Sequence, residues 1–127
     1  MDRDRFRELV TSAVEELPEE FRSRLDNVEV VVEDWPAPYQ LRNARLGNRQ
    51  QLLGLYQGVP LTRRGRGYGM VAPDKITIFQ KPIEIRYRTD AEITEAIGRV
   101  VRHEIAHHFG IGDARLRQLE RGGEAGS

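Results

Sequence analysis

The feature that most constrains the fold is a long amphipathic helix near the C-terminal end of the chain. Thr89 and Glu92 form a capping-box pair, which predicts a helix that starts at about Thr89 or Asp90. Gly110 suits a left-handed C-cap, so this helix should end near it. Between these ends, apolar residues recur at helical spacing: Ile93, Ile97, Val101 and Ile105. The sequence therefore predicts one helix over residues 89–110 with an apolar face.

The remaining pattern indicates an α+β fold. A first helix is expected over residues 6–17, where apolar residues recur at helical spacing, and the proline that follows ends it. Strand patterns follow in four segments: residues 28–32, 52–56, 75–79 and, as an edge strand, 83–87. Asp113 is placed to cap a short last helix, and residues 121–127 should fray. The order of helix, strands, helix and helix is typical of the α+β class.

Length and composition fit one domain and exclude cysteine chemistry. The chain has 127 residues, 39% hydrophobic and 31% charged, so we expect a single domain over residues 1–127. Because there is no cysteine, disulfides, thiol nucleophiles and cysteine-ligated zinc are excluded. Acidic residues within residues 1–18 interrupt any apolar run of the kind an export signal needs. No apolar stretch is long enough to cross a bilayer. We therefore expect a cytoplasmic protein without a membrane partner.

Charge is balanced overall but uneven along the chain. The numbers of basic and acidic residues are equal, yet residues 35–73 contain six arginines and no acidic residue. This segment is either a solvated surface or a patch that attracts an acidic peptide or RNA. Binding through phosphates normally draws on a basic surplus, so we expect no nucleic-acid partner. An RNA-binding protein that uses the arginine-rich residues 42–66 is the alternative.

All three histidines lie in one stretch, RHEIAHHFGIGD, at residues 102–113. At about 100° per residue, His103 and His107 project from the same face of the predicted helix. Two imidazoles at this spacing form a zinc-binding geometry. His108 lies about 100° from His107, so we expect it to be a structural neighbour rather than a ligand. Glu104 falls on the apolar stripe, where a carboxylate is costly unless something compensates for it.

The stretch extends to an HExxHxxGxxD pattern, which adds a third ligand. Gly110 lets the chain turn sharply after His107, so that Asp113 returns toward the metal. His103, His107 and Asp113 would leave the fourth position of a tetrahedral zinc open for water, which is the catalytic arrangement. Asp113 as a helix N-cap is the structural alternative, and the two roles can coexist.

These residues resemble those of the small bacterial zincin-like metallopeptidases, the minimal zincins. The similarity extends from LGLYQGVPLT through PDKITIFQKPIE to the histidine motif. It implies a zincin-like α+β fold in which a small mixed sheet packs against the HExxH helix. It also implies one zinc ion held by His103, His107 and Asp113, with Glu104 in the catalytic position.

Together these patterns predict a zinc-dependent metallopeptidase that acts on a peptide or protein substrate. Glu104 would take the proton of the attacking water and pass it to the leaving amine. The substrate would lie along an edge strand, for which KITIFQ (75–80) is the first candidate. A residue that stabilises the oxyanion is expected, with four equal candidates: Tyr56, Tyr68, Tyr87 and His108. A zincin-fold binding module that holds zinc but is catalytically weak or inactive is the alternative.

Overall fold

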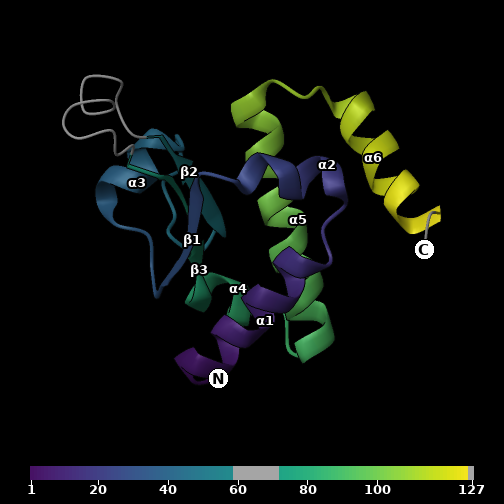
Figure 1. Cartoon of the computed structure of the whole chain (residues 1–127). Helices are drawn as coiled ribbons and strands as arrows, with labels where there is room; N and C mark the ends of the chain where they lie inside the picture. The colour runs from purple at the N-terminus through teal and green to yellow at the C-terminus, as the bar shows by residue number, and fades with distance from the viewer. Residues whose placement is uncertain (59–71, 126–127) are drawn as a thin grey trace.

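A computed structural model describes residues 1–58 and 72–125. In chain order, its elements are α1 (Arg3–Glu15), α2 (Glu19–Arg22), η1 (Ser23–Leu25), β1 (Val28–Glu33), α3 (Pro38–Asn43), β2 (Gly54–Gln57), β3 (Asp74–Phe79), α4 (Gln80–Arg86), α5 (Asp90–Phe109) and α6 (Asp113–Ala125). Figure 1 shows α5 between the sheet and α6. In the described part of the chain, none of the helices is both long and apolar enough to cross a bilayer.

The three described strands form a mixed sheet in the order β1-β3-β2, which confirms the α+β class. β1 runs parallel to β3, with Val30 opposite Ile76, and β2 runs antiparallel to β3, with Tyr56 opposite Ile76. β3 is therefore the central strand, and most of its side chains are buried. The prediction that KITIFQ (75–80) provides a free edge is wrong, because β1 and β2 occupy both of its edges.

The segment after β3 is helical, so the predicted strand over residues 83–87 is also wrong. Pro82 stands in the first turn of α4, where a missing N–H breaks no helical hydrogen bond. Ile83 is buried whereas Ile85 is 49% exposed. Residues two positions apart on a helix point about 200° apart, so a short helix gives the same buried and exposed alternation as a strand.

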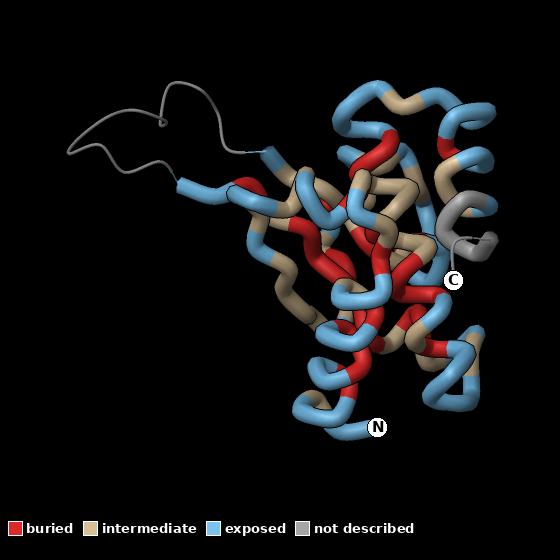
Figure 2. The backbone as a smooth tube through the Cα atoms, turned by 45° about the vertical axis from the view of Figure 1, so that its right-hand side comes forward, coloured by how far each residue is buried: buried red, intermediate tan, exposed pale blue. Residues whose placement is uncertain are grey.

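Both ends of α5 form as predicted. The hydroxyl of Thr89 accepts a hydrogen bond from the backbone N–H of Glu92, and the Glu92 side chain accepts one from the Thr89 N–H. Gly110 ends the helix in the left-handed conformation, at φ 71°. The apolar face of α5 meets α1 and the sheet in the common core, and Figure 2 shows the buried positions gathered there.

The last helix is longer than predicted, since α6 continues to Ala125 instead of fraying from residue 121. Leu116 is buried in the core, and Leu119 packs against it. An ion pair between Arg102 on α5 and Glu120, at 2.8 Å, joins the two helices. The ion pair places the middle of α6 beside the C-terminal half of α5.

A glycine allows β2 to approach α5 closely. A Cβ atom at Gly54 would clash with Cγ1 of Val100 and would lie 3.1 Å from the carbonyl oxygen of Thr77. Val100 is one turn before Glu104 on α5. The missing side chain at Gly54 therefore brings β2 against the turn of α5 that leads into the histidine motif.

We expect Gly54→Ala to destabilise the protein by about 1–3 kcal/mol, because the added methyl group overpacks the contact between β2 and α5. Gly98→Ala is the control, since a Cβ there would meet only the flexible end of Arg102, at 3.3 Å. Alanine in a helix should instead stabilise by about 0.5–1 kcal/mol. Urea unfolding of the metal-free proteins measures both changes, and an undiminished stability of Gly54→Ala would contradict the close approach.

Candidate active site

His103, Glu104 and His107 lie together on the C-terminal half of α5. The two histidines are one turn apart on one helix face, His103 partly buried and His107 exposed. Imidazole nitrogens at this spacing fit zinc in both ligand type and direction. A regular helix therefore provides two of the three predicted ligands without help from the rest of the fold.

The carboxylate of Glu104 is partly buried and is held by the sheet. Its Oε1 accepts a hydrogen bond from the backbone N–H of Tyr56 in β2, over 2.9 Å. The carbonyl of Leu53 accepts a hydrogen bond from the N–H of Phe79, so alternate residues from Leu53 onward face β3. The N–H of Tyr56 consequently faces away from β3, and Glu104 lies at the outer edge of β2.

Burial raises the pKa of the Glu104 carboxyl above its ordinary value. The hydrogen bond from Tyr56 and the interaction with His107 lower this pKa, but they do not offset the loss of solvation. A carboxyl group with a raised pKa is suited to accept a proton and later release it near neutral pH. Among the described residues, no group donates a hydrogen bond to Oε2 of Glu104.

The side chain of Tyr56, whose backbone N–H holds Glu104, forms a cluster with Asp74 and His108. The hydroxyl of Tyr56 donates a hydrogen bond to Oδ2 of Asp74 over 2.6 Å. The Tyr56 ring stacks on the ring of His108, with centroids 3.9 Å apart and planes 16° apart. Nε2 of His108 lies 4.0 Å from the same Asp74 oxygen. The resulting cluster connects β2, β3 and α5.

No sequence pattern singles out Asp74, the first residue of β3, as part of a site. Tyr56 lies opposite Ile76, so Asp74 is its diagonal neighbour on the same face of the antiparallel pair. Diagonal positions about 7–8 Å apart are within reach of a long aromatic side chain. The signal that would identify Asp74 is thus the pairing register, which is visible only when β2 and β3 are aligned.

Asp113 is exposed and is the first residue of α6. The N–H of Leu116 donates to the carbonyl of Gly112, which makes Gly112 the capping position rather than Asp113. Within residues 1–58 and 72–125, no three histidine, aspartate or glutamate side chains lie close enough together to hold a metal ion. The structure does not bring Asp113 together with His103 and His107, so its role as third ligand stays a prediction.

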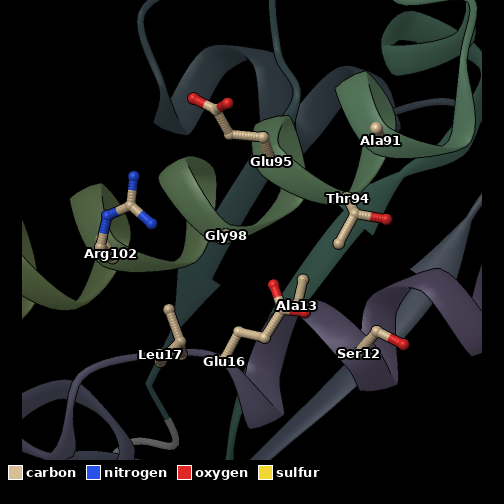
Figure 3. A pocket seen from close by; sticks show the side chains of 9 residues that line it. All are labelled: Ser12, Ala13, Glu16, Leu17, Ala91, Thr94, Glu95, Gly98 and Arg102. Carbon is tan, nitrogen blue, oxygen red and sulfur yellow. The ribbon is translucent and has the colours of Figure 1, made fainter. Parts of the chain in front are cut away.

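A cavity of about 530 Å³ lies on a different face of α5, against α1 (Figure 3). Ala13 lines it from α1, whereas Thr94, Glu95 and Arg102 line it from α5. At about 100° per residue, these three α5 positions lie about 80–180° from His103 around the helix. The candidate active site is therefore the junction of β2 with α5 and not this cavity.

The arginine-rich alternative is only partly visible. Residues 59–66 and Tyr68 lie outside the described part of the chain. Within the described part, the guanidinium of Arg49 lies 4.1 Å from the ring centroid of Trp35. One arginine of the segment therefore packs against an aromatic ring. RNA binding by residues 42–66 stays an untested alternative.

Replacing Glu104 with glutamine should stabilise the metal-free protein near pH 7. A carboxyl pKa raised by folding makes the native state lose stability as the pH rises from the ordinary value, 4.5, through the raised value. The penalty is present at about pH 7 and absent at about pH 3.5, where the carboxyl is protonated in both states. Thermal unfolding with a chelator should show a higher Tm for Glu104→Gln near neutrality only.

Glu95→Gln provides the matched control, because Glu95 is an exposed glutamate of the same helix. Its effect on Tm should be small at both pH values, as for most exposed substitutions. An equal gain of Glu104→Gln over wild type at both pH values would contradict the burial of a charged carboxylate.

Comparison with curated proteins gives no match. Comparison with protein families gives one: the profile described as zincin-like metallopeptidase matches residues 25–123. The matched range is more than three quarters of the chain and includes the sheet and the histidine motif on α5. The chain therefore belongs to the zincin-like metallopeptidase family.

Proposed function

We propose that this protein is a zinc-dependent metallopeptidase that hydrolyses peptide bonds with Glu104 as general base. Membership of the zincin-like family supports the reaction class. One observation carries the assignment of the base: the partly buried Glu104 carboxylate lies between two zinc-type ligands in the chain and is held by the N–H of Tyr56. An oriented carboxylate with a raised pKa beside such ligands is the arrangement that general base catalysis needs.

Each residue has a distinct role in this proposal. His103 and His107 would hold one zinc ion, with Asp113 as the third ligand. Zinc, when bound, supplies a Lewis acid that polarises the scissile carbonyl and lowers the pKa of water. Oε1 of Glu104 stays with Tyr56, while Oε2 takes the proton of the attacking water and later delivers it to the leaving amine.

The outer edge of β2 replaces KITIFQ as the proposed position of the substrate. Among the described strands β2 lies at an edge of the sheet, and the N–H of Tyr56 on that edge points to Glu104. The backbone groups of Gly54 face the same edge, because alternate residues of a strand share a direction. A peptide extended along this edge would pass directly beside the proposed base.

A zincin-fold binding module without turnover is the second candidate. The observation that favours it is the position of Asp113, which forms no three-residue metal group with the histidine pair in the described structure. Such a protein would bind a peptide along the same strand edge and leave it intact. Cleavage of any peptide that depends on Glu104 distinguishes the metallopeptidase from this module.

The direct test is the activity of Glu104→Gln. We expect kcat to fall about 10²–10⁴-fold, because the variant lacks the proton acceptor. Zinc content should be unchanged, since the amide is nearly isosteric and Glu104 is not proposed as a ligand. The measurement is mass-spectrometric digestion of a peptide library by zinc-loaded wild type, Glu104→Gln and Glu95→Gln, the last of which should remain active. Equal rates for the first two would remove Glu104 from the mechanism.

Zinc affinity tests the proposed ligands His103 and Asp113 separately. Wild type should bind about one zinc per chain, and His103→Ala should abolish that binding. Asp113→Ala should weaken it at least about tenfold, since even partners outside the ligand shell contribute that much. Competition with a chromophoric chelator measures affinity, and thermal unfolding of the metal-free proteins reports the fold. An unchanged zinc affinity of Asp113→Ala together with a lower Tm would mean that Asp113 only stabilises the start of α6 and is not a ligand.

A further inference from the structure

Both the side chain and the backbone N–H of Tyr56 make contacts in the candidate active site. Its hydroxyl donates to Asp74 on β3, and its ring lies flat against His108 on α5. Phe109 adds an edge-on contact to the Tyr56 ring, with centroids 6.3 Å apart. The backbone N–H of the same residue donates to Oε1 of Glu104. One residue thus connects a buried aspartate with the proposed general base.

The position of Tyr56 explains why a side-chain anchor matters. β2 has four residues and lies at an edge of the sheet, so no described strand fixes its outer backbone groups. Asp74, in contrast, is 7% exposed and belongs to the central strand. A short hydrogen bond to a carboxylate of a central strand is stronger and more directional than a neutral one. The hydrogen bond to Asp74 therefore ties the edge strand β2 to the central strand β3.

We propose that Tyr56 is a positioning residue for Glu104, and that Asp74 and His108 fix Tyr56 in the orientation that directs its N–H at Oε1. The contact holds the carboxylate in one rotamer and leaves Oε2 for the proton of the attacking water. The catalytic consequence rests on the proposed function, whereas the contact between Tyr56 and Glu104 can be measured without activity. The two parts can therefore be tested separately.

The structural part is tested by NMR of the metal-free protein. The backbone amide proton of Tyr56 should resonate downfield because it donates to a carboxylate, and Glu104→Ala sets the shift when the acceptor is lost. Asp74→Ala should move this signal upfield toward the Glu104→Ala value. Asp74→Asn keeps an acceptor oxygen for the Tyr56 hydroxyl and should restore most of the wild-type shift. Asp34→Ala, an exposed aspartate after β1, is the control and should leave the signal in place.

The catalytic part is tested by steady-state kinetics at equal zinc content. Tyr56→Phe removes only the hydroxyl and should lower kcat about tenfold or more with KM unchanged, because small misplacements of catalytic groups cost up to about 100-fold. Tyr39→Phe removes a hydroxyl from an exposed tyrosine of α3 and should keep the wild-type kcat. A role confined to stability would lower Tm and leave kcat of the folded protein unchanged.

Each outcome decides one part. An unmoved Tyr56 amide signal in folded Asp74→Ala overturns the proposal, whatever the enzyme does. A moved signal with wild-type kcat in Tyr56→Phe also overturns it, because the anchor then positions nothing that the reaction uses. A wild type that cleaves no peptide contradicts the proposed function alone, and the NMR result then decides whether Asp74 holds the Tyr56–Glu104 contact.

Discussion

The close contact between β2 and α5 is the constraint on which the candidate site depends. It begins where Gly54 meets Val100 and continues to the hydrogen bond from Tyr56 to Glu104. Two residues of a strand advance about 6.8 Å, and four residues of a helix advance about 6 Å. The two elements therefore stay in step over one helical turn. Because Gly54 lets β2 lie close to Val100, the N–H of Tyr56 two residues later reaches the carboxylate of Glu104.

Desolvation and hydrogen bonding act in opposite directions on the Glu104 carboxylate. Burial of a carboxylate disfavours its charged form, and the raised pKa of Glu104 shows that desolvation outweighs the contributions of Tyr56 and His107. One hydrogen bond to a charged group contributes about 1.5–3 kcal/mol, and the direction of the pKa change shows that it does not fully offset this partial desolvation. Carboxyl groups whose pKa is raised by desolvation are concentrated at sites of chemistry, which agrees with the proposed role of Glu104 as general base.

The sequence predicts those parts of the structure that local signals specify. The bounds of α5 follow from the Thr89–Glu92 pair and Gly110, all within or next to the helix itself. The spacing of His103 and His107 is likewise a property of any regular helix. The central position of β3 is not local, because strand order depends on which segments pair across the fold. For the same reason, the contact between Tyr56 and Asp74 could not be predicted without the register of β2 and β3.

Asp113 shows how a local sequence motif and the packing of distant segments together determine the candidate site. The histidine pair keeps its spacing wherever α5 forms, but the distance from that pair to Asp113 depends on the angle between two helices. Gly110 sets this angle through its left-handed conformation, and the N–H of Ile111 closes the turn on the carbonyl of Ala106 at 2.8 Å. Burial of Leu116 and the ion pair of Arg102 then fix the direction of α6. A motif specifies the order of ligands along the chain, whereas packing at this joint determines whether the third ligand meets the other two.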